Sequence, residues 1–432
     1  MRITHNYLAP LCALIFFSLA GLAPAQTAAQ NPAPAPRQIT LAEALTAATQ
    51  NIDAQISRQF VNSARADVTA ANRAPLPVLS TGVSQIDLQN GIGAGSFLTQ
   101  KRIDKNIGFD WTWERGNKRA LRTEAAAQAA NASAQDLREL LTQQKLLASN
   151  AFFDLLAAQE RISQVGNIAA SAQQLADAAI KRLAAGDLSA QDTARSNIEA
   201  ERAKNEVTLA EQVRAQAELA LNLVLDLGPQ KLVANRQEAT SSKAYSSASP
   251  SLPSVDERAD VQAALARVAS AKSILSNALA LKQNDITLGT AFDHFPGTST
   301  RLLTFRMQVP LQLSSLGGYG FAGEIARAEA QLAIAEAALE RVRHTAFNDG
   351  LRLVQDLKSS QTRAASYSEG IAPQAKRVAD QAELAYNKGA LSLTDLLEAR
   401  RVWRATTLEA IAAQTDFEKA LSSWNIRLES LK

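Results

Sequence analysis

Residues that commonly carry catalysis or bind metals are sparse in this chain of 432 residues. It contains one cysteine and three histidines, and both Cys12 and His5 lie near the N-terminus in a stretch that indicates an export signal. Only His294 and His344 then remain, too few for the histidine or thiolate ligand sets that hold zinc. No nucleophile–base pattern stands out either. We therefore expect no catalytic residues, no bound metal and no cofactor.

One pattern that contains a carboxylate occurs twice. Gly-x-Leu-Ser-x-x-Asp stands at residues 186–192 and again at residues 389–395. In each copy the glycine suits the left-handed conformation that ends an incoming helix. The serine then caps the outgoing helix, and Asp192 or Asp395, three residues later, closes a capping box. The pattern predicts two tight tips between long helices, and therefore an internal duplication.

The two copies differ in their apolar residues. Leu391 and Leu396 have the spacing of a hydrophobic staple, which fixes the angle at which the chain enters a helix. The first copy carries Thr193 where its second staple residue would stand. The sequence therefore predicts a stapled second tip and a first tip without this contact.

The first 25 residues have the features of a signal peptide. Arg2 gives a positive start, residues 8–22 are mostly apolar, and residues 23–25 form an Ala-Pro-Ala cleavage site. Cys12 lies inside the apolar stretch and not at the cleavage site, so we expect no lipid attachment. In the whole chain, 45 Lys and Arg nearly balance 42 Asp and Glu, which does not favour a nucleic-acid partner.

Helical and strand-like segments follow the same order in both halves of the chain. Residues 26–38 form a Pro/Ala linker that we expect to be disordered. The first repeat (39–228) has a helical region, a strand pair (78–90 and 103–113), a long helix (117–184), a tip (185–189) and a helix (189–226). After a connector at 229–254, the second repeat (255–432) has a helix, a strand pair (285–295 and 302–313), a long helix (321–387), a tip (388–392) and a helix (392–428). Helices this long predict a coiled-coil-like assembly.

The predicted strands have one apolar and one polar face, because Ile107, Phe109, Trp111 and Trp113 alternate with polar residues or glycine. The polar face suits the wet lumen of an outer-membrane barrel, although a soluble sheet packed on the helices would show the same alternation. Four strands are too few to close a barrel, so the membrane interpretation predicts an oligomer. Trp111, Trp113, Phe295 and Phe305 would then form aromatic girdles at the membrane interfaces.

Four segments of the chain match one known family. They are residues 39–45 (Ile-Thr-Leu-Ala-Glu-Ala-Leu), 258–261 (Arg-Ala-Asp-Val), 309–311 (Val-Pro-Leu) and 386–399, which include the second tip. On these residues the chain resembles the outer-membrane efflux proteins, the TolC-like exit ducts of Gram-negative tripartite pumps. The resemblance implies an α+β membrane protein. Three chains would share one transmembrane β-barrel, with four strands from each, above a long α-helical barrel.

A further segment resembles one branch of that family. Residues 113–119 (Trp-Glu-Arg-Gly-Asn-Lys-Arg) are similar to the signature of the cobalt–zinc–cadmium resistance proteins. A strand-to-helix turn with a purely structural role would have the same composition. The resemblance therefore implies metal efflux slightly ahead of drug efflux.

The resemblance also implies where function lies. In the family, an acidic ring and tip contacts close the periplasmic end, and motif matching assigns this gate to Asp395, Glu398, Asp192 and Tyr386. A periplasmic adaptor would contact the tips at Gly186, Leu188, Gly389, Leu391 and Leu393. For Asp192 and Asp395 a capping role alone is the alternative, and for the leucines it is packing inside the hairpin. Leu391 replaces an arginine of the best-known members, which predicts a weaker or different closing latch.

We therefore predict a homotrimeric channel of the Gram-negative outer membrane that forms the exit duct of a tripartite RND-type efflux pump. Its partners would be a periplasmic membrane-fusion adaptor, an inner-membrane RND-type transporter and outer-membrane lipid. Its cargo would be heavy-metal cations or small toxic compounds. Two alternatives remain open from the sequence: the duct of a type I protein-secretion system, and a soluble periplasmic coiled-coil adaptor or scaffold.

Overall fold

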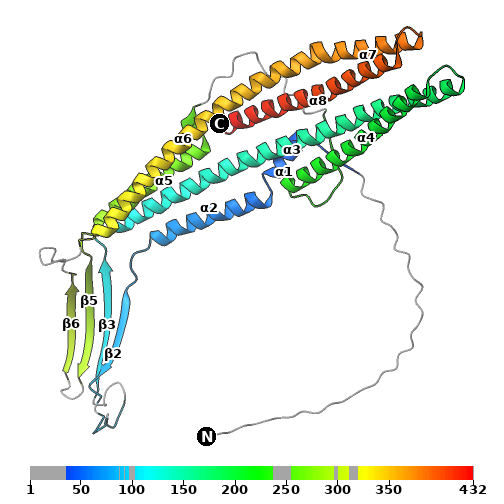
Figure 1. The fold of residues 1–432 in the computed structure, drawn as a ribbon. Coiled ribbons are helices and arrows are strands. Elements are labelled where there is room, and N and C mark those ends of the chain that lie inside the picture. The colour runs from blue at the N-terminus through cyan, green and yellow to red at the C-terminus, as the bar shows by residue number, and fades with distance from the viewer. Residues whose placement is uncertain are drawn as a thin grey trace, which may run out of the picture. The chain divides into compact units, whose positions relative to one another are not determined.

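The computed structural model describes residues 36–86, 88–91, 93–96, 103–236, 254–295, 300–310 and 320–431. The predicted signal peptide, residues 26–35 of the predicted linker and residues 237–253 of the predicted connector lie outside this part of the chain. The elements of the two halves are shown in Figure 1.

The same order of elements occurs twice (Figure 1). The first half consists of β1 (Arg37–Ile39), α1 (Leu41–Ala48), α2 (Ile52–Ala71), β2 (Val78–Ser84), β3 (Asp104–Trp113), α3 (Lys118–Ala184), α4 (Ala190–Leu225) and β4 (Leu232–Ala234). The second half consists of the 3-10 turn η2 (Val255–Glu257), α5 (Ala259–Ala280), β5 (Ile286–Phe295), β6 (Thr300–Gln308), α6 (Ala322–Ala365), the π-helical segment η4 (Ser366–Ile371), α7 (Ala372–Asn387) and α8 (Leu393–Glu429). Each half thus contains helix, strand pair, long helix, tip and helix.

The two long helices start in the same way. Asn117 and Phe321 precede α3 and α6 with left-handed φ angles of 56° and 57°. Helix α3 then continues for 67 residues, a length of about 100 Å at the rise of an α-helix. It packs along α4, α5, α2 and α8, so Ala-rich surfaces are buried between neighbouring helices. None of the helices in the described part of the chain is both long and apolar enough to span a membrane.

A compact apolar core lies where α1, α3 and α4 meet β1 and β4. Phe152, Leu155 and Leu221 are fully buried there, and each such side chain stabilises the fold by about 1.5–3 kcal/mol. Strands β1 and β4 pair in parallel over this core, with Ile39 opposite Ala234. The prediction of a disordered linker up to residue 38 is therefore wrong at its end. The partner strand lies far away in the sequence, inside the predicted connector, so local composition does not reveal the pairing.

The other sheet is antiparallel, with the strand order β2-β3-β5-β6. Two of its strands are shorter than the alternation of the sequence predicts. Strand β2 ends at Ser84 because Gln85 adopts a left-handed φ of 57°. Strand β6 ends at Gln308, shortly before Pro310, which has no N–H to donate to a ladder; residues 311–313 of the predicted strand lie outside the described residues.

The register sorts the side chains of this sheet onto two different faces. The apolar face carries Leu79, Val83, Ile107, Phe109, Trp111, Trp113, Ile286, Leu288, Phe292, Leu303, Phe305 and Met307. Thr81 and Thr290 lie among them, and one row at the end of this face holds Lys105, His294 and Arg301. The polar face carries Ser80, Ser84, Asn106, Asp110, Thr112, Thr287, Asp293, Thr304, Arg306 and Gln308. Among the described residues, no helix packs extensively on either face, and the apolar side chains remain open, Phe305 to 79%.

The second long helix is interrupted, unlike the first. The sequence predicts one helix over 321–387 with bends at Gly350, Gly370 or Pro373. The structure has η4 between α6 and α7, which contains Gly370 and ends shortly before Pro373, whereas α6 continues through Gly350. A proline inside a helix lacks the N–H for the usual bond and its ring crowds the carbonyl four residues earlier. The wider π turn just before Pro373 accommodates both effects.

Candidate functional site

The two hairpin tips share one backbone geometry. Gly186 and Gly389 have φ angles of +83° and +72°. After them, the amide of Asp187 donates to the carbonyl of Arg182 (2.9 Å), and the amide of Ala390 donates to that of Ala385 (2.8 Å). These bonds satisfy helix-end carbonyls in the Schellman arrangement. The backbone of both tips is therefore as the repeated pattern predicts.

The serine caps form, but the predicted capping boxes close differently. Ser189 accepts from the amide of Asp192 (3.1 Å) and Ser392 from that of Asp395 (3.2 Å). In each case the aspartate carboxylate accepts from the serine hydroxyl, at 2.8 and 2.7 Å, and not from the serine backbone. The box at Thr40, by contrast, is complete, with the carboxylate of Glu43 accepting from the backbone N–H of Thr40 at 3.0 Å. Aspartate is one methylene shorter than glutamate, which accounts for the difference.

The second tip has an apolar core. Tyr386, Leu393, Leu396 and Leu397 are buried together, and Leu391 packs against them, as the staple spacing predicts. The first tip instead buries the side chain of Thr193, whose hydroxyl donates to the carbonyl of Ser189 at 3.1 Å. One tip is thus held by apolar packing and the other by hydroxyl hydrogen bonds.

The four proposed gate residues have different surroundings. Asp192 and Asp395 are engaged by their serine caps, and Asp192 also lies 3.8 Å from Arg195. Tyr386 is 9% exposed, and the guanidinium of Arg182 lies 5.4 Å from its ring centre. Glu398 takes no part in a cap, and 65% of its side chain is open, with Arg401 at 3.6 Å. In the described chain the structure therefore leaves Glu398 as the most available of the four.

The five proposed adaptor contacts also divide into two sets. Gly186 and Gly389 are exposed and Leu188 is half-buried. Leu393 is buried and Leu391 packs on the same cluster, so these two leucines serve the hairpin core in this conformation. The exposed part of each tip is its backbone turn.

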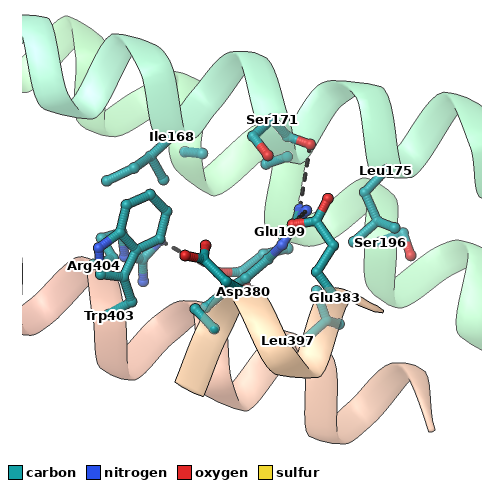
Figure 2. Close-up of a pocket in the computed structure, with 14 residues that line it drawn as sticks. Ile168, Ser171, Leu175, Ser196, Glu199, Asp380, Glu383, Leu397, Trp403 and Arg404 are labelled. Atoms are coloured by element: carbon teal, nitrogen blue, oxygen red, sulfur yellow. Dashed lines mark hydrogen bonds and ion pairs between the residues drawn. The ribbon is translucent and has the colours of Figure 1, made fainter. Parts of the chain in front are cut away.

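The α3–α4 hairpin and the α7–α8 hairpin contact each other a short distance from their tips, through Glu199 of α4. Its carboxylate, 10% exposed, accepts from Arg401 at 3.1 Å and from Arg404 at 3.3 Å, both on α8. Figure 2 shows Glu199 and Arg404 among the residues that converge here from α3, α4, α7 and α8. The hydrogen bond to Glu199 raises the pKa of Arg401 above its ordinary value. We call this group of contacts the hairpin joint.

Two further contacts extend the hairpin joint. Arg400 donates to the carbonyl of Ser171 on α3 (3.3 Å) and pairs with Glu383 of α7 at 3.0 Å. Nearer the tips, Arg195 donates to the hydroxyl of Thr394 at 3.0 Å. The enclosed cavity has a volume of about 50 Å³, far below that of a pocket for an organic ligand. The site can hold two helical hairpins together, and it does not resemble a substrate pocket.

No local sequence pattern indicates the hairpin joint. Its charged residues are spread over α4, α7 and α8, and each one alone resembles an ordinary charge on a solvated helix face. The internal duplication could have indicated this contact, because Glu199 and the pair Arg401 and Arg404 lie at similar numbers of residues from their tip glycines. Hairpins of equal length that lie side by side bring such positions together.

The proposed aromatic girdle residues do not share one face. Trp111, Trp113 and Phe305 lie on the apolar face, about half to four-fifths exposed. Phe295 pairs with Thr300, which places it on the polar face. It therefore does not join the other three. No group of three or more His, Cys, Asp or Glu side chains in the described residues has a metal-binding arrangement.

Comparisons with known proteins identify the fold. No protein-family model matches the chain, and no curated protein matches it. The structure is similar to the open state of the Neisseria gonorrhoeae MtrE outer-membrane channel, with 18% identity, a TM-score of 0.74 and coverage of 90% of this chain and 88% of that one. It is also similar to the Campylobacter jejuni outer-membrane channel CmeC (14%, 0.70, 90% and 85%) and to CusC, whose structures concern transmembrane channel formation (17%, 0.65, 89% and 91%).

These structures define a class. The chain has the fold of outer-membrane channels, as its resemblance to the outer-membrane efflux proteins predicted.

Proposed function

We propose that three copies of this chain form an exit duct across the Gram-negative outer membrane for a tripartite RND-type efflux pump. Strands β2, β3, β5 and β6 would supply one third of a closed β-barrel, and the long helices would form the duct in the periplasm. An adaptor would contact the exposed turns at Gly186 and Gly389. Glu398, with Asp192, Asp395 and Tyr386, would lie at the closing end.

The single observation that carries this proposal is the sheet. It has free edges at β2 and β6 among the described residues, one exposed apolar face and one polar face. An exposed apolar surface of this extent is costly in water, and it is stabilising against lipid when the opposite face lines a wet lumen. A soluble scaffold would need helices packed on the apolar face, and none packs there extensively in the described chain. The similarity to outer-membrane channels supports the same conclusion.

The cargo is the finer part of the proposal, and we propose metal cations or small toxic compounds. The segment that resembles the metal-resistance signature has structural roles of its own. Lys118 donates to the carbonyl of Gln283 (2.6 Å) and pairs with Asp285 (2.8 Å), while Arg122 pairs with Glu114. These contacts hold the strand-to-helix turn, so support for metal cargo rests on the resemblance alone. Metal and drug sensitivity of a deletion strain, complemented by the gene, separates the two.

Single-channel recording in a planar bilayer tests the duct itself. The purified protein should insert and conduct in small, cation-selective steps. The double variant Glu398→Gln, Asp395→Asn should lose that selectivity or conduct in larger steps if these carboxylates close the duct. A well-folded preparation that never inserts, and that extracts without detergent, would favour the soluble scaffold and defeat the proposal.

A further inference from the structure

Three residues of the polar face stand side by side in one row across the sheet. Asp110 of β3 is in register with Gly289 of β5, and Gly289 is in register with Arg306 of β6. The side chains of Asp110 and Arg306 form an ion pair. This pair therefore spans the middle strand and passes over the glycine between its members.

Gly289 is what makes the crossing possible. A Cβ at this position would lie within 3 Å of an oxygen of the Asp110 carboxylate, closer than real Cβ atoms approach, and 3.3 Å from Nε of Arg306, which is a tight contact. The same device recurs on this face with uncharged neighbours. The side chain of Ser80 lies over Gly108 and that of Asn106 over Gly82, each with an oxygen 2.6 Å from the absent Cβ. Polar side chains here lie flat against the sheet.

We propose that the Asp110–Arg306 pair sets the electrostatic potential of the lumen wall, and that Gly289 is the residue that keeps the pair flat and closed. This inference rests on the proposed function, in which the polar face lines the duct. Each chain would contribute one pair, so the barrel would carry a ring of neutralised charge. At the level of this ring the wall should discriminate little between cations and anions. Asp293, two positions further along the same face of β5, keeps its charge in every variant compared below.

The effect of each substitution depends on the partner that keeps its charge and on how far that side chain is exposed to the lumen. The Arg306 side chain is 57% exposed, whereas that of Asp110 is 19% exposed. If Asp110 loses its charge, an exposed guanidinium remains and the local potential becomes positive. If Arg306 loses its charge, the carboxylate remains and the local potential becomes negative. Loss of both charges should restore the local potential of the parent.

A local probe tests this without dependence on the closing end. Gln308 lies on the polar face of β6, two residues from Arg306, and the chain's one cysteine is Cys12. The Gln308→Cys variant is reconstituted into vesicles, and its cysteine is allowed to react with two methanethiosulfonate reagents, a cationic one with a trimethylammonium group and an anionic one with a sulfonate group. The quantity measured is the ratio of the cationic to the anionic reaction rate. The parent without Gln308→Cys corrects for any reaction at Cys12.

Opposite shifts are expected. Asp110→Asn should lower the cation-to-anion rate ratio and Arg306→Gln should raise it, each roughly threefold for one nearby charge in a wet, screened site. The double variant should return to the background ratio. Gly289→Ala should also slow a bulky neutral reagent roughly twofold, because the displaced pair narrows the lumen. Gly228→Ala, whose Cβ meets nothing within 4 Å, should not.

The outcomes separate this inference from the proposed function. Channels in a planar bilayer with unchanged rate ratios in both charge variants would overturn the role of the pair and leave the duct intact. A preparation that forms no channels would defeat the duct. A heat-resistant oligomer on a gel, retained in Asp110→Asn and Arg306→Gln, shows that the shifts come from charge and not from misfolding.

Discussion

The two hairpin tips have the same backbone and different cores, and the difference shows what a duplicated unit preserves. Both tips keep the left-handed glycine and the serine cap. The second buries Leu396 at 1% exposure in an apolar cluster, whereas the first buries the hydroxyl of Thr193. Turn geometry depends on one or two residues and persists, while the packing beneath it diverges. The second tip should therefore be the more rigid of the two.

The largest expected effect comes from Leu396→Ala. Removal of a fully buried leucine costs about 2–4 kcal/mol through lost burial and the cavity left behind. The loss should be centred on the α7–α8 tip, which supplies most of the cluster around Leu396, although Leu175 of α3 also packs against it. Hydrogen exchange of the tip amides should accelerate more in the α7–α8 hairpin than at the tip of the α3–α4 hairpin.

The matched control at the first tip is Thr193→Ala. It removes a hydroxyl and one methyl group, a loss of about 1 kcal/mol by the hydrogen-bond term. If this variant loosens its tip as much as Leu396→Ala loosens the other, the apolar cluster does not make the second tip the more rigid.

Glu199→Gln should have the next largest effect, on the contact between the hairpins. The neutral amide keeps the shape of the side chain but loses the charge that Arg401 and Arg404 share. Because Arg401 is 44% exposed, solvent screens part of the interaction, and we expect a loss of about 1–2 kcal/mol.

The measurement is hydrogen exchange along α4 and α8, which should rise together. Glu201→Gln, on the exposed side of the same helix, changes the same charge away from the joint and should leave both helices unchanged. Equal effects of the two variants would mean that net charge, and not the joint, governs the contact.

The starts of the two repeats differ as the tips do. The first start is held by apolar burial around β1, β4 and α1. The second also has an apolar cluster, around Val261 and Leu339, but adds Arg258, which pairs with Asp260 at 2.9 Å and with Asp349 at 3.0 Å. Apolar burial does not depend on pH, whereas ion pairs do. Acid should therefore loosen the second start first.

Asp349 sets the direction of that pH effect. Burial alone would raise the pKa of Asp349, but hydrogen bonds from Arg258 and Arg352 outweigh it and lower the pKa. A lowered pKa in the folded state gives stability that is present above the ordinary aspartate value and is lost as the pH falls through the folded value. Below about pH 4, amide exchange in α5 should rise before that in α1.

Asp349→Asn removes this pH dependence. The variant should be less stable by about 1 kcal/mol at neutral pH and should show a smaller further loss in acid. Acid sensitivity that is the same in the variant and the parent would assign the effect to other carboxylates.

Sequence patterns predicted what local physics determines. The left-handed glycines, the serine caps, the long helices and the strand alternation each depend on residues close together in the chain. The β1–β4 pairing and the hairpin joint depend on residues far apart, so no local pattern contains them. The assignment of Phe295 to the aromatic girdle was a local error, because Phe295 is three residues from Phe292 in one strand and alternation already places the two on opposite faces. The predicted capping boxes were wrong in one detail, because the aspartate carboxylates accept from the serine hydroxyls and not from the serine backbone N–H groups.

The smallest expected effect tests why α3 is continuous while its counterpart is divided by η4. If the missing N–H of Pro373 and the crowding of the Glu369 carbonyl create the π turn, Pro373→Ala should let the α-helix continue through residues 366–371. The stability change should stay within about 0.5 kcal/mol, because one restored hydrogen bond offsets the packing adjustments. Hydrogen exchange of the amides of residues 366–371 should slow.

Unchanged exchange rates would mean that packing, and not Pro373, maintains the π turn. The hydrogen bond that Tyr367 donates to Glu409 on α8 (3.0 Å) would then be the contact that opposes a continuous α-helix. Tyr367→Phe in the Pro373→Ala background should then release it.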